Sequence, residues 1–276
     1  MNKSDVKRQA REGRGEITAD FAEGFEGYSD QELTAFLDSR NSQIRTAAAQ
    51  ILGKRKFLAA VPDLCFRLKK EKALYVRIAI SDALSSIGAG AIPEMMKYVG
   101  KIGGNQYQDL PSEIFQKWNY PLPRDIIIRS IIRMGIPALE KLNEFLLESD
   151  EPEVSEIIDA IGHISFYSQD QSSFDNLVRI MAEYHQNELI VWKVLRALQA
   201  FPNPRTHQLL KHILLNGDIP QYRWEAARSL GQIGTKTAEE YLEMVMNDSD
   251  DKVRTMVKLS LQHIHNSNHK DLEGKQ

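Results

Sequence analysis

Two tryptophan–arginine pairs are the residues of this sequence whose types and spacing point most directly to chemistry. Trp192 precedes Arg196 by four residues and Trp224 precedes Arg228 by the same interval, which is about one turn of a helix. Tryptophan offers a large rigid surface with one hydrogen-bond donor, and arginine offers a planar cation that binds a carboxylate or phosphate through two hydrogen bonds. Both residue types are enriched where proteins bind partners. The pattern therefore indicates recognition.

The sequence offers no set of catalytic residues as clear as these two pairs. No Ser-His-Asp or Cys-His set can be proposed from spacing, and Cys65 is expected to be a small core residue. The sequence from Gly88 to Gly90 lacks the Gly-Lys-Ser/Thr of a phosphate loop and indicates a turn. His263, His265 and His269 cluster in a polar tail, where we expect a frayed terminus and no metal site. We expect no catalytic residue, metal ion or cofactor.

The tryptophan–arginine pairs lie within a pattern of residues that repeats along the chain. We number the positions of each repeat as offsets from a position zero. Position zero falls on Arg45, Arg77, Arg124, Val154, Val191, Arg223 and Arg254. Seven residues later every unit has Leu or Ile: Leu52, Leu84, Ile131, Ile161, Leu198, Leu230 and Leu261. Apolar residues also recur at offsets three and ten, with one exception at Arg55. Offsets three, seven and ten share one face of an α-helix, so each unit contains a helix with a buried stripe.

The length of the repeat leaves room for a second helix in each unit. The period is close to 31 residues, with two insertions. The preceding helices begin at Ile92, Ile136, Ser173, Thr206 and Ala238. No segment shows a sustained alternation of period two, which a half-buried strand would require. The sequence therefore predicts an all-α fold built from helix pairs.

The motifs of these pairs resemble HEAT-like repeats, the short variety found in phycobilin lyases and many bacterial proteins. The resemblance covers residues 29–265 and rests on Val61-Pro62, Ile92-Pro93, Ile136-Pro137, Tyr75-Val76-Arg77, Lys252-Val253-Arg254 and the Gly-x-Ile-Gly after Leu230. It implies a right-handed α-solenoid of about seven helix pairs, with the second helices lining a concave surface. The sequence departs from the pattern at Val154 and Val191, where the usual Arg is absent, and at residues 103–124, which stretch the third unit.

The second helices have a further face, at offsets one, five and nine, which the resemblance directs into the concavity. Trp192 and Trp224 share offset one, and Arg196 and Arg228 share offset five, so we predict a two-by-two patch with rows roughly 10 Å apart. The expected binding surface also includes Arg129, Arg133, Asp159 and His163. In the alternative interpretation, each Trp packs between repeats and the Arg stacks on it.

The remaining segments are expected to extend or cap the solenoid. Residues 103–124 carry Tyr107, Phe115, Trp118 and Tyr120, too many apolar groups to stay solvated. We expect either a short helix over SEIFQKW, folded on an edge of the solenoid, or a flap that borders the concave site or docks a partner. Residues 1–28 are expected to form a mobile polar arm or a cap, and residues 266–276 a disordered tail.

Charge and hydropathy narrow the class of protein. With 35 basic and 38 acidic residues, the net charge of −3 gives no bulk attraction to nucleic acid or anionic membrane. The most apolar run is broken by Arg129, Arg133 and Pro137, well short of the ~20 residues that span a bilayer. A single cysteine, and the lack of a secretory-type apolar segment in the first 28 residues, favour a cytoplasmic protein.

We therefore expect a non-enzymatic bacterial scaffold or adaptor that holds an acidic segment of a partner protein in its concave groove. One alternative is a DNA-binding protein that resembles the HEAT-like alkylpurine glycosylases, which the net negative charge disfavours. Another is a lyase or chaperone-like subunit that acts on a cofactor-bearing protein. A HEAT-like di-iron hydroxylase is disfavoured because none of the seven histidines is followed by Glu.

Overall fold

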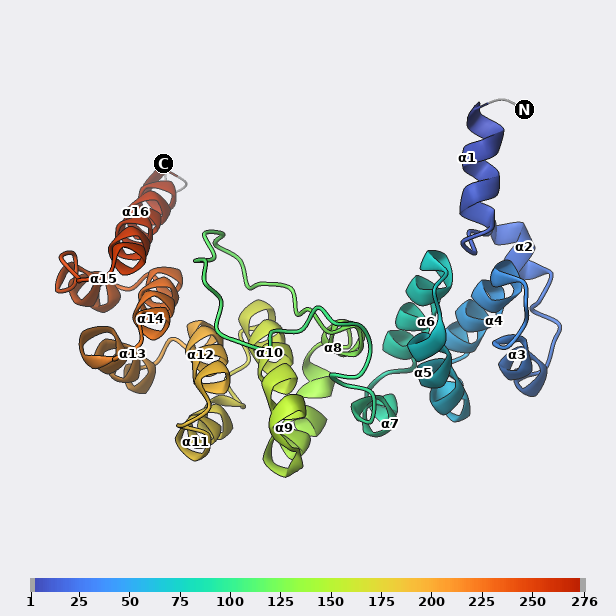
Figure 1. Ribbon diagram of the computed structural model, residues 1–276, viewed down its shortest axis with the longest axis horizontal. Helices are drawn as coiled ribbons and strands as arrows, with labels where there is room; N and C mark the ends of the chain where they lie inside the picture. Colours follow the sequence, from blue (N-terminus) through green and yellow to red (C-terminus); the bar gives the residue numbers. More distant parts are fainter. Residues whose placement is uncertain (1–2, 274–276) are drawn as a thin grey trace. The chain divides into compact units, whose positions relative to one another are not determined.

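The computed structural model describes residues 3–273, with side chains from 4 to 267, as α-helices and short 3-10 helices joined by turns. No strand occurs in residues 3–273, which confirms the predicted all-α class. The chain divides into two compact units, shown in Figure 1. Unit 1 comprises Met1–Gln106 and Pro123–Lys141, and unit 2 comprises Tyr107–Leu122 and Leu142–Gln276.

Unit 1 consists of three helix pairs with a helical cap. The pairs are α3 (Asp30–Phe36) with α4 (Ser42–Lys54), α5 (Val61–Lys70) with α6 (Leu74–Ile87), and α7 (Ile92–Met96) with α8 (Ile126–Ile132). Three 3-10 helices lead into first helices: η1 (Leu58–Ala60), η2 (Ala89–Ala91) and η3 (Ile136–Ala138). Because α4 packs on α6 and α6 on α8, the second helices form one layer and the first helices another.

Unit 2 continues the same arrangement with four pairs. They are α9 (Leu139–Glu148) with α10 (Glu151–Ser168), α11 (Phe174–Glu183) with α12 (Glu188–Ala197), α13 (Pro204–Asn216) with α14 (Pro220–Ile233), and α15 (Lys236–Glu243) with α16 (Asp251–Glu273). The 3-10 helix η4 (Leu198–Ala200) extends α12. We refer to α10, α12, α14 and α16, which pack on one another in this order, as the inner layer. Seven pairs in residues 30–273 make an α-solenoid with the predicted number of repeats.

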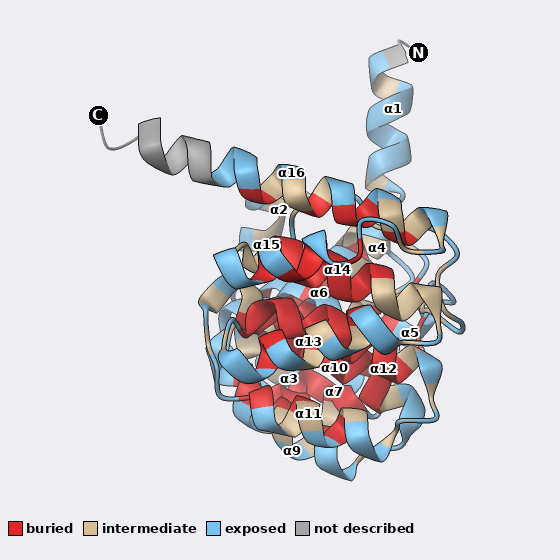
Figure 2. Ribbon diagram, turned by 90° about the vertical axis from the view of Figure 1, so that its left-hand side faces the viewer, coloured by how far each residue is buried: buried red, intermediate tan, exposed pale blue. Residues whose placement is uncertain are grey.

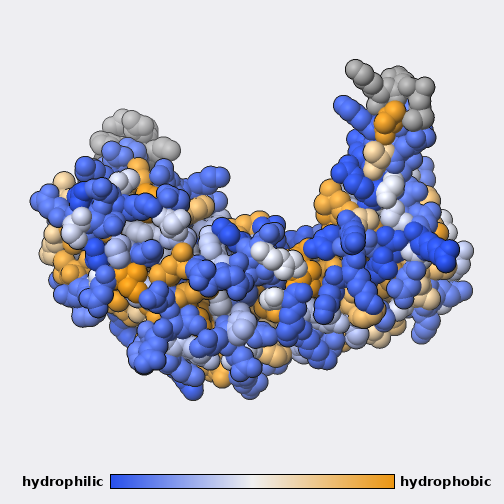
Figure 3. Space-filling view, viewed as in Figure 1, coloured by the Kyte–Doolittle hydropathy of each residue, from blue (hydrophilic) through white to orange (hydrophobic). Residues whose placement is uncertain are grey.

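The predicted stripe is the core of each second helix. At offset seven, six of the seven Leu and Ile residues are fully buried, namely Leu52, Leu84, Ile131, Ile161, Leu198 and Leu230. Buried residues follow one side of α13, whereas residues 224–231 of α14 are all buried, so that the middle of this inner helix is covered on every side (Figure 2). Hydrophilic residues dominate the face shown in Figure 3, with hydrophobic patches among them. No helix in the described part of the chain is apolar over a length that would cross a bilayer.

Glycines set how closely neighbouring second helices approach. A Cβ at Gly53 of α4 would lie 2.5 Å from the Cα of Ala83 in α6. A Cβ at Gly231 of α14 would lie 2.9 Å from the Cα of Ser260 in α16. Real Cβ atoms do not tolerate such contacts with backbone. These two glycines therefore permit backbone-to-backbone packing that no other residue type allows.

The N-terminal segment caps unit 1. Helix α1 (Lys3–Glu12) is largely exposed and is followed by α2 (Ala19–Glu23). Residues between them bond to the first repeats: the Thr46 hydroxyl donates to the Gly15 carbonyl at 2.8 Å, and the Tyr75 N–H donates to the Arg14 carbonyl at 3.1 Å. Of the two expected forms, a cap describes this segment. At the other end, α16 runs to Glu273, and residues 274–276 of the expected disordered tail lie outside the described part.

The insertion contains no helix. Between α7 and α8 the chain is irregular throughout, and the short helix predicted over SEIFQKW is wrong. Pro121 and Pro123 exclude a helix from the end of the insertion, whereas no proline lies within SEIFQKW itself. The segment instead directs its aromatic side chains onto the inner layer, as the contacts below show. We refer to residues 107–122, the part of the insertion that belongs to unit 2, as the strap.

Candidate functional site

The structure places the two tryptophan–arginine pairs side by side in the inner layer of unit 2. The Trp192 ring of α12 and the Trp224 ring of α14 lie 6.0 Å apart between centroids, at an interplanar angle of 71°. The Arg196 guanidinium carbon lies 4.2 Å from the Trp192 ring centroid. The equivalence of these positions in successive repeats, which the sequence frame predicts, is therefore confirmed.

The predicted exposure of these side chains is wrong. Trp192 and Trp224 are 2% and 1% exposed, and Arg196 and Arg228 are 3% and 0% exposed. None of the four projects into an open concavity. The physical reason is that the strap contacts three of them: Tyr107 lies against Trp192 and Arg196, and Arg228 bonds to the strap main chain. Trp224 packs on Trp192.

Three aromatic residues of the strap each contact a different residue of the inner layer. The Tyr107 ring meets Trp192 edge-on, with centroids 5.6 Å apart, and the Phe115 ring centroid lies 5.0 Å from the Arg228 guanidinium carbon. Trp118 stacks in parallel on His263 of α16 at 4.1 Å. The strap is thus a flap over the concave site, one of the two forms expected from the sequence.

Arg228 holds the main chain of the strap. Its Nη2 donates to the carbonyl oxygens of Lys117 at 3.2 Å and Asn119 at 2.9 Å. Its Nη1 donates to Glu225 at 3.3 Å and to Gln199 at 3.4 Å, which fixes the guanidinium plane. Two bonds from one planar cation to two carbonyls of an irregular segment amount to recognition of polypeptide backbone.

Two further contacts hold the strap at its middle and its end. Lys252 of α16 donates to the Ser112 carbonyl and pairs with Glu113 at 3.1 Å. At the other end, Tyr120 is 1% exposed and lies over Gly162 of α10. A Cβ at Gly162 would lie 2.0 Å from the Tyr120 hydroxyl oxygen and 2.6 Å from Cζ, so glycine creates the space that this ring occupies.

A buried network of opposite charges lies beneath the strap. Lys193 pairs with Glu156 at 2.8 Å and with Asp159 at 3.0 Å, and Arg196 pairs with Asp159 at 2.7 Å. Arg228 pairs with Glu225 at 3.3 Å. These three cations and three carboxylates are balanced in charge, so the arginines do not present an unpaired positive surface. The observation removes the reason for which the sequence favoured an acidic partner.

The protonation of the network follows from its burial and its pairs. Burial opposes the ionisation of Asp159, but Arg196 and Lys193 outweigh it and lower the pKa of Asp159. For Glu225, burial prevails over Arg228 and raises the pKa. Burial also lowers the pKa of Arg228, in spite of Glu225. The neighbouring cations thus favour the ionised form of Asp159, whereas burial disfavours the charged forms of Glu225 and Arg228.

Several polar atoms at this interface have no hydrogen-bond partner. They include the N–H donors Nε1 of Trp192, Nε of Arg196 and Nε of Arg228, together with Oε2 of Glu225 and the Tyr120 hydroxyl. Burial without a partner costs about 1–3 kcal/mol for a neutral group. The strap therefore covers the inner layer while these five groups remain without hydrogen-bond partners.

The other predicted site residues fall into two groups. Asp159 belongs to the buried network, and His163 lies half-buried beside Tyr120, where burial lowers its pKa. Arg129 and Arg133 belong to unit 1, where Arg129 donates to the Pro123 carbonyl at 2.6 Å and Arg133 pairs with Asp82. The structure therefore brings six of the eight residues together in unit 2.

Sequence reasoning missed the buried charges at offset two. This position holds Glu156, Lys193 and Glu225 in three successive second helices, where the other units have Ala47, Ala79, Ile126 and Met256. An apolar position that becomes Glu, Lys and Glu in adjacent repeats is the signal that could have identified an interhelical network. No comparable feature of the sequence indicated that Arg228 would donate hydrogen bonds to the strap.

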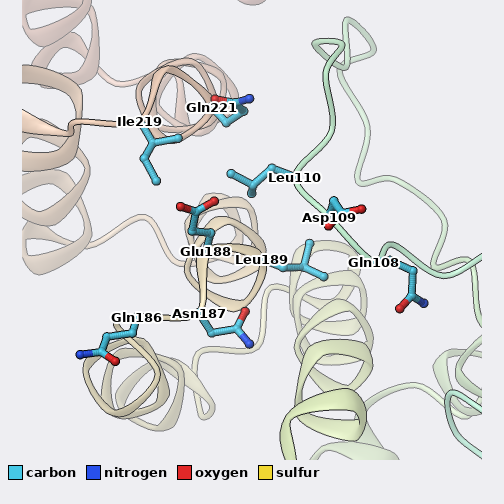
Figure 4. A pocket seen from close by; sticks show the side chains of 9 residues that line it. All are labelled: Gln108, Asp109, Leu110, Gln186, Asn187, Glu188, Leu189, Ile219 and Gln221. Atoms are coloured by element: carbon cyan, nitrogen blue, oxygen red, sulfur yellow. The ribbon is translucent and has the colours of Figure 1, made fainter.

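An open pocket borders the strap where α12 and α14 begin. It has a volume of about 560 Å³ and is lined by strap residues 108–110, residues 186–189, Ile219 and Gln221. Figure 4 shows Leu110 of the strap extending toward Ile219 and Gln221. Most of the polar lining is carboxylate or amide, from Asp109, Glu188 and the glutamines. Among the described side chains, no group of His, Cys, Asp or Glu is arranged to hold a metal ion; that of His269 lies outside them.

Comparison with known families identifies one of the repeats. Residues 222–248, which span most of α14 together with α15, match the PBS lyase HEAT-like repeat. A search of curated proteins found no match.

Solved structures of helical-repeat proteins are similar over most of the chain at low identity. A designed armadillo repeat protein in complex with the peptide (KR)4 is 14% identical and has a TM-score of 0.40, covering 86% of this chain and 100% of that one. Human deoxyhypusine hydroxylase in complex with glycerol is 16% identical with a TM-score of 0.39, covering 95% and 98%. The complex of CpcE and CpcF of phycocyanin lyase from Nostoc sp. PCC7120 is 16% identical with a TM-score of 0.33, covering 86% and 95%.

Proposed function

We propose that this chain, which carries a PBS lyase HEAT-like repeat at residues 222–248, is a non-enzymatic cytoplasmic scaffold or adaptor. In this proposal the inner layer of unit 2 holds an extended segment of a partner protein. Fold alone does not determine function, so the proposal rests on the chemistry of this layer.

One observation carries the proposal: Arg228 donates to two main-chain carbonyls of an irregular segment, at Lys117 and Asn119. Main-chain bonds provide affinity that does not depend on side-chain identity, and neighbouring pockets provide specificity. The tryptophans of α12 and α14 supply a broad apolar floor, and the charged network beneath them fixes their position. These features suit an extended polypeptide.

The chemistry of the partner follows from the unsatisfied donors. Three N–H groups in the layer, on Trp192, Arg196 and Arg228, have no acceptor. A partner side chain with an oxygen acceptor, either a carboxylate or an amide, would satisfy them. An acidic segment remains within the proposal for this reason, although the arginines already have carboxylate partners.

The DNA-binding alternative receives no support from the site. Lys193, Arg196 and Arg228 are already paired with buried carboxylates, so they are not available to bind phosphates. The lyase-subunit alternative has one observation in its favour, the PBS lyase type of the repeat. A visible absorbance band in the protein purified from its native cell would support that second candidate.

Peptide selection on the immobilised full-length chain tests the proposal. We expect random peptides displayed on phage to enrich for aromatic residues together with Asp, Glu, Asn or Gln. Arg228→Lys keeps a cation but loses the planar grip on two carbonyls, and it should release the selected peptides. Arg205→Lys, at an exposed arginine of α13 that pairs with Asp175, is the matched control and should retain them. No enrichment, or equal retention by Arg228→Lys, would contradict the proposal.

A further inference from the structure

We propose that the strap is a built-in ligand of the inner layer, and that a partner segment binds by displacing it. The inference rests on the proposed function and deepens it: the site is occupied by the chain itself until a competitor of similar chemistry arrives. The competitor is an extended polypeptide with aromatic residues spaced like Phe115, Trp118 and Tyr120, and with a side-chain oxygen acceptor.

The strap is held to the helices by few contacts, as a bound peptide ligand is. It has no helix or strand of its own, and Tyr120 is the one fully buried residue among its sixteen. The rings of Phe115 and Trp118 are half-buried, and the side chains of Lys117 and Asn119 between and beside them are exposed. A segment held by a few side chains and two main-chain bonds can open without unfolding the helices beneath it.

The unsatisfied groups of the site make the strap a replaceable occupant. The Tyr120 hydroxyl and the three N–H donors of the layer are buried without partners while the strap is in place. Each of them opposes strap binding, because water would satisfy these groups in the open state. A partner segment that supplies an acceptor would avoid part of this cost and would therefore compete.

Covalent attachment explains how an imperfect ligand occupies the site. A tethered segment has an effective concentration in the range of millimolar, so a free peptide competes poorly until the tethered contact is weakened. The contact that can be weakened most selectively is Tyr120 with Gly162, because each partner can be changed separately.

The experiment uses full-length chains and a fluorescein-labelled synthetic peptide of residues 107–122. Tyr120→Ala removes the buried anchor of the tethered strap and leaves the inner layer unchanged. We expect this variant to bind the peptide at least about tenfold more tightly than the wild-type chain, by fluorescence anisotropy. Adding Gly162→Ala should abolish the gain, because its Cβ would occupy the place of the incoming tyrosine hydroxyl.

Controls separate displacement from loss of structure. Tyr167→Ala removes an exposed tyrosine of the same helix, α10, and should bind the peptide as weakly as the wild type. Circular dichroism checks each variant, and Phe115→Ala, which weakens the contact with Arg228, serves as a second releasing variant if Tyr120→Ala is unstable.

The outcomes distinguish the inference from the proposed function. The inference that the strap is a built-in ligand is overturned if the wild type and both releasing variants bind the synthetic peptide equally. It is also overturned if tighter binding by Tyr120→Ala survives the addition of Gly162→Ala. If the synthetic peptide binds no variant while phage-selected peptides bind the wild type, the strap is a permanent part of the fold and only the inference fails. If neither kind of peptide binds any chain, the proposed function fails with it.

Discussion

At the scale of residues, the tryptophan–arginine pairs combine packing with recognition. Trp192 and Trp224 are buried and pack on each other, and the edge-on contact with Tyr107 of the strap is made by Trp192. Arg228 pairs with Glu225 within its own helix and extends its other nitrogen to the strap. The packing interpretation offered by the sequence is confirmed for both rings, and the binding interpretation stays a proposal.

Trp224→Ala should destabilise unit 2 by about 3–5 kcal/mol, the usual loss for a buried aromatic ring. Chemical denaturation followed by circular dichroism measures the change. Trp118→Ala removes a half-buried ring that stacks on His263 and should cost distinctly less. A stability unaffected by Trp224→Ala would show that this ring does not belong to the core.

The Arg228–Glu225 pair should behave as a buried pair. Arg228→Met leaves the Glu225 carboxyl buried without its cation, and a loss of about 3–5 kcal/mol in unfolding free energy is expected. Adding Glu225→Gln should recover part of that loss. The exposed pair Arg205–Asp175 is the control, for which about 0–1 kcal/mol is expected. Additive effects at Arg228 and Glu225 would contradict the coupling.

At the scale of elements, the second helices use one repeat position in two ways. Offset eight is glycine in α4, α10 and α14, at Gly53, Gly162 and Gly231. Gly53 and Gly231 allow the next second helix to pack against the backbone. Gly162 makes room for Tyr120 of the strap. The same small residue thus permits solenoid packing in two repeats and strap docking in a third.

Gly231→Ala should destabilise the protein, although Gly→Ala in a helix ordinarily stabilises by about 1 kcal/mol. Its Cβ would lie 2.5 Å from the Ser260 Cβ and 2.9 Å from the Cα, so α14 and α16 must separate. A loss of about 1–3 kcal/mol is expected in thermal or chemical denaturation. Gly27→Ala, where a Cβ meets no atom within 4 Å, should be nearly neutral. A stabilised Gly231→Ala variant would refute this packing.

Glu71, at the turn between α5 and α6, should make unit 1 sensitive to acid. Burial opposes its ionisation, but hydrogen bonds from Arg45, Ala73 and Arg67 prevail and lower its pKa to about 2. A lowered folded-state pKa contributes stability above the unfolded-state pKa, and that contribution is lost as pH falls towards 2.

Glu71→Gln should therefore lower the unfolding free energy by about 1.5–3 kcal/mol at neutral pH. The difference from wild type should shrink progressively as pH falls from about 5 to about 2. Chemical denaturation at several pH values measures it. A difference that stays constant over this interval would show that the carboxylate charge is not the stabilising feature.

Periodicity predicted much of this architecture, and the reason is local. Offsets three, seven and ten fixed the buried stripe from residues within one helix, and equal offsets placed Trp192 beside Trp224. The burial of both rings was not predictable in the same way. For Trp192 it depends on Tyr107, which reaches the inner layer through an irregular segment that has no sequence periodicity.

At the scale of the whole molecule, the strap lies in the sequence between two stretches of unit 1 and belongs to unit 2. Its ends continue into unit 1, at Gln106 and Pro123, and its own residues belong to unit 2. The net charge of −3 and the balanced network beneath the strap leave recognition to hydrogen bonds and aromatic contacts. The proposed binding at unit 2 would therefore involve a segment whose covalent neighbours in the sequence lie in unit 1.

Cleavage of the strap by trypsin after Lys117, in the presence of a saturating phage-selected peptide, tests the central claim most directly. The claim is that a partner segment and the strap compete for the inner layer of unit 2. It predicts that the peptide accelerates this cleavage, because the displaced strap loses the bonds from Arg228 to Lys117 and Asn119. A peptide that binds but leaves the cleavage rate unchanged, or slows it, would contradict the account.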